Sequence, residues 1–208
     1  MFVSANKRGE VNKTIALLSK NRPLMHSLHG KPDDWGISKH TIEFFRDNVK
    51  SSWFTLEIGS GISTLVLTAL AHKHTAINPS IGDKNRVDKK IQELTIEGNL
   101  HFIRERSEHI LPSLEGKYDL ILIDGCHTFP WPTTDWFYSV PLLKNNGLIV
   151  LDDIDWWPVR IVHEYMIKSP GWRLRHQDER YSVFQLKSPE LACPSKWELQ
   201  PPLEINYD

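Results

Sequence analysis

The feature that most constrains this chain is a short apolar run that passes through two glycines into a helical pattern, Phe54–Thr64. The run from Phe54 to Ile58 is typical of a buried strand, and Gly59 and Gly61 follow it directly. Beyond the glycines, apolar residues recur with helical spacing, at Ile62, Leu65, Val66, Ala69 and Leu70. A strand that enters a helix through such a turn lets backbone N–H groups approach a polar ligand, because glycine has no side chain to block them. The stretch therefore predicts a cofactor-binding turn.

Strand-like and helix-like patterns alternate along the rest of the chain. Strands are predicted at 75–78, 100–103, 118–124 and 148–151, with helical periodicity in the segments between them. Such alternation implies parallel pairing with right-handed crossovers. The last two strand-like runs, 172–176 and 181–186, flank a polar turn and predict a closing antiparallel hairpin.

Length and composition favour one domain with flanking segments. A chain of 208 residues with 40% hydrophobic content is long enough for one sizeable core. We expect the domain at 33–188, after an N-terminal appendage, 1–32, that carries one short helical pattern. A proline-containing tail, 189–208, is expected to be an extended strap.

Charge and cysteine content exclude several classes of partner. The formal net charge of -1 gives no general electrostatic hold on nucleic acid. The chain has no basic-then-apolar leader and no long apolar run, and its two cysteines are too few for a disulfide framework. We therefore expect a cytoplasmic protein with no nucleic-acid or membrane partner. The composition is compatible with a homo-oligomer but does not determine one.

Acidic residues stand at the ends of the predicted strands: Glu57, Asp124, Asp152 and Asp153. Ligands of an open parallel sheet bind at the carboxyl ends of its strands, so these side chains are expected at one edge. Carboxylates crowded there would repel and raise each other's pKa, and a divalent cation such as Mg²⁺ would relieve that repulsion. The alternative for any single aspartate is a helix cap or a solvated turn residue.

His127 stands three residues beyond Asp124. Because an imidazole titrates near neutral pH, it can accept a proton from a substrate hydroxyl while a nearby cation stabilises the alkoxide. The alternative is a histidine packed in its loop against Phe129 and Trp131.

Two motifs resemble one enzyme family. Glu57-Ile58-Gly59-Ser60-Gly61 resembles the first motif of class I S-adenosylmethionine-dependent methyltransferases. Asp124-Gly-x-His127 with the later Asp152-Asp153 is similar to the pattern of cation-dependent O-methyltransferases that act on small molecules. The resemblance implies an α/β fold, a Rossmann-like, doubly wound, mostly parallel seven-stranded sheet with a C-terminal antiparallel hairpin.

The same resemblance implies a role for each site residue. S-adenosylmethionine would be held by Glu57, Gly59, Ser60, Gly61, Ser63, Asn78, Ser107 and Asp124. Mg²⁺ would be held by Asp124, Asp152 and Asp153, and His127 would accept the proton of a small-molecule hydroxyl. The chain departs from the family at Asn78, where an acid for the ribose is usual, and at Arg106, where an aspartate near the adenine is common.

Two other functions stay open on the sequence. With both cofactor-contacting acids replaced, the domain would also suit a degenerate methyltransferase that acts as a non-catalytic binding module. A nicotinamide-dependent oxidoreductase is disfavoured, because the glycine spacing does not match the dinucleotide fingerprint and Asn78 stands where that fingerprint has an acid.

Overall fold

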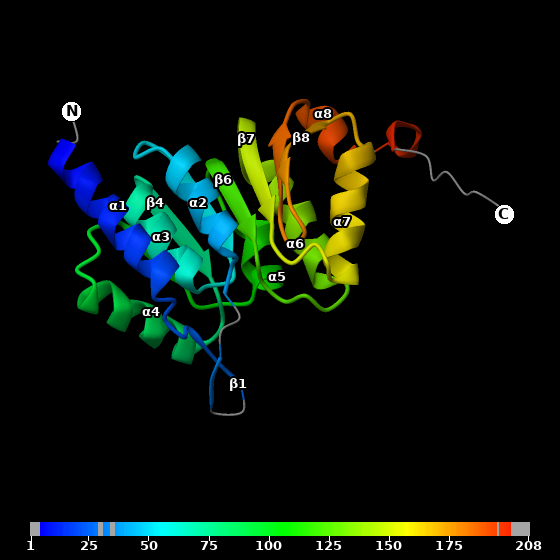
Figure 1. Ribbon diagram of the computed structural model, residues 1–208. Coiled ribbons are helices and arrows are strands. Elements are labelled where there is room, and N and C mark those ends of the chain that lie inside the picture. Colours follow the sequence, from blue (N-terminus) through cyan, green and yellow to red (C-terminus); the bar gives the residue numbers. More distant parts are fainter. Residues whose placement is uncertain (1–4, 29–30, 34–35, 195, 201–208) are drawn as a thin grey trace.

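A computed structural model describes residues 5–28, 31–33, 36–194 and 196–200. Its centre is a seven-stranded sheet with the strand order β5-β4-β3-β6-β7-β9-β8 (Figure 1). The first five of these strands pair in parallel, and β9 pairs antiparallel with both β7 and β8. The strands are β3 (Phe54–Ile58), β4 (Lys73–Ile77), β5 (Leu100–Ile103), β6 (Tyr118–Ile123), β7 (Leu143–Leu151), β8 (Trp172–Gln177) and β9 (Ser182–Leu186). This order confirms the predicted doubly wound sheet with its closing hairpin.

Helices cover both faces of the sheet (Figure 1). One face carries α1 (Ala5–Lys20), α2 (Lys39–Asn48), α3 (Ile62–Leu70) and α4 (Ile81–Glu93). The other carries the short α5 (Ser107–Ile110) with η1 (Leu111–Ser113), then α6 (Trp131–Ser139) with η2 (Val140–Leu142), and α7 (Trp157–Lys168). Among the described residues, none of the helices combines the length and apolar character needed to cross a bilayer.

The apolar strand β6 divides the core between these two faces. Leu120 and Leu122 pack on the α3 side, whereas Ile121 and Ile123 pack on the α6 side. All four are buried because successive side chains of a strand point to opposite faces, and here both faces are covered. This explains why the last four residues of β6 are all apolar and do not alternate with polar ones.

The two ends of the chain differ from the sequence expectation. The predicted short helix at the N-terminus is the longer α1, and its Ile15 and Leu18 are buried in the core against α2 and α3. A two-stranded hairpin, β1 (His26–Leu28) with β2 (Lys31–Asp33), follows it and was not predicted. At the other end, the expected strap contains α8 (Pro189–Ala192) and η3 (Trp197–Leu199). The Leu191 N–H donates to the Ser188 carbonyl at 3.1 Å, and the Trp172 indole N–H donates to the carbonyl of the buried Ala192 at 3.0 Å, which holds this turn of helix against β8. Residues 201–208 lie outside the described part.

Candidate active site

A cavity of about 910 Å³ opens at the edge where the parallel strands end. Its wall includes the residues that follow four strands: Gly59 after β3, Asn78 after β4, Asp124 after β6 and Asp153 near the end of β7. The register explains this meeting, because Ile58 of β3 pairs with the last residues of both β4 and β6. The strand ends are therefore level, and the loops that leave them surround one space.

Gly59 is required by the way the loops meet. Its φ is +114°, and a Cβ placed on it would lie 2.1 Å from the carbonyl oxygen of Asp124. Gly125 is also confined, since a Cβ there would lie 2.9 Å from Cγ2 of Ile58. The turn after β3 and the loop after β6 thus pack backbone to backbone, which leaves the cavity above them open.

Glu57 holds this turn from behind and does not line the cavity. Its fully buried carboxylate accepts hydrogen bonds from the hydroxyls of Ser63 and Thr64, the latter at 2.7 Å, and lies 3.0 Å from Nε2 of His74. Nδ1 of His74 in turn lies 2.9 Å from the hydroxyl of Thr55. The Glu57 side chain points beneath the turn toward α3, and a contact of Glu57 and Ser63 with the cofactor stays a prediction.

Gly61 and Ser60 are placed differently within the turn. The Gly61 N–H donates to Thr64 Oγ1 at 2.9 Å, so it is engaged within α3. Ser60 lines the cavity, and its hydroxyl accepts a hydrogen bond from Nδ2 of Asn78 at 2.8 Å. The Asn78 side-chain oxygen accepts the N–H of Ser80 at 2.8 Å. Asn78 therefore ties the loops after β3 and β4 together at the position predicted for the ribose.

Ser107 lines the end of the cavity near β5, together with Arg106 and Trp131. The Arg106 guanidinium lies over the Trp131 ring, 5.6 Å from its centroid. Ser107 is also hydrogen-bonded to the carboxylate of Asp135 in α6, which is 1% exposed. Burial raises the pKa of Asp135 to about 6, and its Oδ1 has no partner among the described residues. No pattern in the sequence points to Asp135, because only the packing of α6 beneath Gly125 and Ser107 brings it here.

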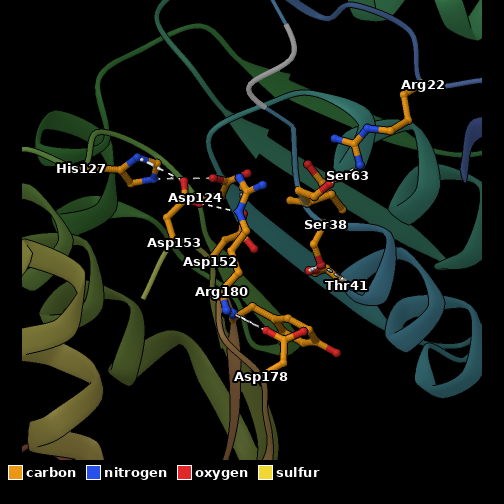
Figure 2. A network of polar contacts seen from close by, with 12 residues as sticks. Arg22, Ser38, Thr41, Ser63, Asp124, His127, Asp152, Asp153, Asp178 and Arg180 are labelled. Atoms are coloured by element: carbon orange, nitrogen blue, oxygen red, sulfur yellow. Dashed lines mark hydrogen bonds and ion pairs between the residues drawn. The ribbon is translucent and has the colours of Figure 1, made fainter. Parts of the chain in front are cut away.

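Three side chains converge at the other end of the cavity (Figure 2). Donor atoms of Asp124, His127 and Asp153 all lie within 4.8 Å of one another. His127 Nδ1 lies 3.4 Å from Oδ2 of Asp153, and His127 Nε2 lies 3.7 Å from Oδ1 of Asp124. Asp153 adopts a left-handed backbone conformation, φ 57°, which turns the chain out of β7. His127, predicted as a proton acceptor, is thus placed among the candidate cation ligands.

Asp152 is not part of this group, in contrast to the predicted ligand set of Asp124, Asp152 and Asp153. Its side chain is fully buried, does not line the cavity, and has two carboxylate oxygens without a hydrogen-bond partner among the described residues. Both residues follow the end of β7, and the left-handed backbone of Asp153 brings only that residue to the cavity wall. Burial, reinforced by Asp124 and Asp153, raises the pKa of Asp152 well above its ordinary value.

Arg180 completes the cluster and was missed in the sequence. It lies in the turn between β8 and β9, and it lines the cavity. Its Nε donates to Oδ1 of Asp153 at 2.7 Å, and its Nη2 lies 3.7 Å from Oδ2 of Asp152 (Figure 2). A polar hairpin turn has no pattern that would reveal such a contact; the antiparallel pairing of β9 with β7 creates it.

Burial and mutual charge set the electrostatics of this end. Burial, with smaller contributions from Glu57 and Asp153, raises the pKa of Asp124 to about 6 although His127 opposes the shift. Burial alone would lower the pKa of His127, but the carboxylates of Asp124 and Asp153 outweigh it and raise the pKa above its ordinary value. The cluster therefore attracts positive charge.

The donor set of Asp124, His127 and Asp153 fits a divalent cation. Ligands on opposite sides of a hard cation lie roughly 4–5 Å apart, since each metal–oxygen bond is about 2.0–2.6 Å. The three donors lie within 4.8 Å of one another, which meets this limit. Carboxylate oxygens favour Mg²⁺, Ca²⁺ or Mn²⁺, and an imidazole is accepted by Mn²⁺ and other transition metals.

Known structures share the architecture of this chain at low sequence identity. A putative O-methyltransferase from Klebsiella pneumoniae is 13% identical with a TM-score of 0.64, covering 86% of this chain and 90% of that chain. The O-methyltransferase TomG from Streptomyces achromogenes, involved in tomaymycin synthesis, is 14% identical with a TM-score of 0.63 and the same coverage. A putative rRNA methylase from Clostridium thermocellum is 11% identical with a TM-score of 0.59, covering 71% of this chain and 95% of that chain. These likenesses establish the fold but not the acceptor.

The family match is more specific than the fold. No curated protein is similar enough to this chain to count as a match. Residues 56–154 match the family described as "Methyltransferase domain", a span that runs from β3 to just beyond β7 and includes the cavity residues Gly59, Asn78, Asp124 and Asp153. Residues 56–154 therefore match a methyltransferase domain, and the strand order around them is that of the class I methyltransferase fold.

Proposed function

We propose that this protein transfers a methyl group from S-adenosylmethionine to a hydroxyl group of a small molecule, with a divalent cation and His127 assisting. The observation that carries the proposal is the convergence of Asp124, His127 and Asp153 in the same cavity as the turn at Gly59. A methyl donor over that turn would reach an acceptor held at the three side chains without leaving the cavity.

Each residue has a chemical task in this reaction. A bound cation supplies positive charge that lowers the pKa of a coordinated hydroxyl and stabilises its alkoxide. Asp124 and Asp153 would hold the cation, and Mg²⁺ is the ion we propose. His127 would accept the hydroxyl proton. The alkoxide oxygen would then attack the sulfonium methyl carbon in line, so that the O–C bond forms as the C–S bond breaks and S-adenosylhomocysteine leaves. The walls of the cavity contribute by alignment and by exclusion of water.

Shape and charge support a small acceptor. Trp131 and Trp156 flank the cavity, and Trp156 is 59% exposed at its side, where a substrate ring or chain would contact it. The formal net charge of -1 offers no broad basic surface for RNA. We therefore propose a small-molecule hydroxyl acceptor and no nucleic-acid or membrane partner.

Binding measurements test the cation site first. Titration of the protein with Mg²⁺ or Mn²⁺, followed by calorimetry or by the Mn²⁺ paramagnetic resonance signal, should show one site that weakens strongly in Asp124→Asn and Asp153→Asn. His127→Ala separates the two tasks of the imidazole, because a base can be removed without loss of the cation but a ligand cannot. His101→Ala, an exposed histidine on β5 outside the cavity, is the matched control.

Activity measurements then test the chemistry. Methyl transfer from labelled S-adenosylmethionine is followed with catechol, a flavonoid with adjacent hydroxyls and a methyl glucoside as acceptors. We expect turnover that exhaustive chelation abolishes and added Mg²⁺ restores, and a loss of about 10²–10⁴-fold in His127→Ala. Turnover that survives chelation, or full activity in His127→Ala, would remove the cation or the histidine from the mechanism.

A further inference from the structure

The segment between α1 and β1 is anchored to the domain on the cofactor side of the cavity. Met25 is buried, and its carbonyl accepts a hydrogen bond from Nε of Arg86 in α4 at 2.7 Å. Arg86 is paired with Asp83, and Asp83 lies 3.4 Å from Nδ2 of Asn78. A chain of polar contacts therefore links Asn78, which lines the cavity after β4, to the residue that precedes His26.

His26 extends from this anchor into the cavity. It lines the cavity, and its Nε2 lies 3.1 Å from the position that a Cβ on Gly61 would occupy. The imidazole thus covers the glycine turn and occupies the space that the missing side chain leaves. Among the described residues, this imidazole has no hydrogen-bond or ion-pair partner.

The positions of the cavity residues indicate which part of the cofactor would lie beside His26. S-adenosylmethionine has a nucleoside, a reacting methyl group and an amino-acid arm. Asn78 and Ser107 occupy the end of the cavity that belongs to β4 and β5, whereas Asp124 and Asp153 occupy the end where methyl transfer would take place. The turn from Gly59 to Gly61 lies between them, and it leaves the amino-acid arm beside His26.

Charge supports the same placement. The carboxylate of the amino-acid arm needs a donor, and the acidic cluster would repel it. Of the arginines that line the cavity, Arg180 is bonded to Asp153, and Arg106 lies on Trp131 at the nucleoside end. His26 is a donor in the cavity that is not already engaged.

We propose that His26 binds the carboxylate of the amino-acid arm of S-adenosylmethionine, so that the segment from α1 to β1 is a working part of the cofactor site. The inference rests on S-adenosylmethionine as the cofactor, but it does not depend on the hydroxyl acceptor or the cation. It also gives a reason for Gly61, since a side chain there would collide with the imidazole.

Two natural fragments of the cofactor test the contact. S-adenosylhomocysteine carries the amino-acid arm, and 5′-methylthioadenosine has the same nucleoside and sulfur without it. Calorimetry of both ligands with the wild-type chain, His26→Ala and His26→Gln isolates the arm. His101→Ala is the control, and thermal unfolding of each variant checks that the fold is intact.

The expected result is selective. His26→Ala should bind S-adenosylhomocysteine at least about tenfold more weakly and 5′-methylthioadenosine unchanged, because only a hydrogen bond to a charged group is lost. His26→Gln, which keeps a donor, should fall between. An equal loss for both ligands, or no loss for S-adenosylhomocysteine, would overturn the contact. A wild-type chain that binds neither ligand would instead overturn the assignment of S-adenosylmethionine as the cofactor. That result differs from failure of the His26 contact, in which the wild-type chain still binds both ligands.

Discussion

Replacement of Asp135 by Asn is expected to stabilise the protein at neutral pH. Asp135 is 1% exposed, its Oδ1 has no partner among the described residues, and burial raises its pKa to about 6 from an ordinary value of 3.8. A difference of one pKa unit between the folded and unfolded states corresponds to about 1.4 kcal/mol, so holding this carboxylate ionised costs roughly 3 kcal/mol at neutral pH. Asn keeps the shape and the contact with Ser107 but carries no charge.

The sign follows from proton linkage. Because the folded-state pKa of Asp135 is raised, the folded protein binds more protons than the unfolded chain between about pH 4 and pH 6. The contribution of Asp135 to stability is therefore fully present below about pH 4 and is lost as the pH rises through about 6. The advantage of Asp135→Asn should be near zero at pH 4 and should reach its maximum above pH 7.

Urea unfolding at several pH values measures this advantage. An advantage of roughly 3 kcal/mol would appear as a rise of about 6–12 °C in the melting temperature for a chain of this size. The matched control is Asp119→Asn, which should destabilise, because the Asp119 carboxylate accepts hydrogen bonds from the Phe54 N–H and from Lys144, each at 2.8 Å. A gain in Asp135→Asn that does not vary with pH, or a loss at every pH, would refute the reasoning.

Three further substitutions test the site. Gly59→Ala should lower the free energy of unfolding, measured by urea titration, by about 3 kcal/mol or more, since the new Cβ would overlap the Asp124 carbonyl at a positive φ. The control is Gly9→Ala, which has open space around it in α1 and should be neutral or slightly stabilising in the same titration. His74→Ala should cost about 1–3 kcal/mol by removing the hydrogen bond between the His74 ring and the buried Glu57 carboxylate, and an unchanged urea midpoint would contradict that. Arg180→Gln should tighten Mn²⁺ binding about tenfold in a resonance titration, because a guanidinium no longer competes for Asp153; weaker binding would mean that Arg180 orients Asp153 for the cation.

Local pattern was sufficient for the fold because the signals of a doubly wound sheet are local. The run at β6, buried on both faces, and the glycines after β3 each constrain their own segment, and the alternation of strand with helix constrains the topology. The proximity of Asp124, His127 and Asp153 could also be predicted from the sequence, since the strand ends of a parallel sheet meet at one edge.

The tertiary structure decided which side chains of that edge face the cavity. Glu57 and Asp152 stand at strand ends by sequence, yet both are buried behind the wall, because a side chain's direction depends on strand register and on the helix packed against it. His26, Asp135 and Arg180 lie in a hairpin, a helix and a turn, respectively. The sequence pattern of these segments does not predict that they meet at the cavity. The sequence by itself determined the sheet and the edge at which chemistry takes place. Long-range packing selected the groups that surround the cofactor, because contacts between distant segments leave no periodic trace in either of them.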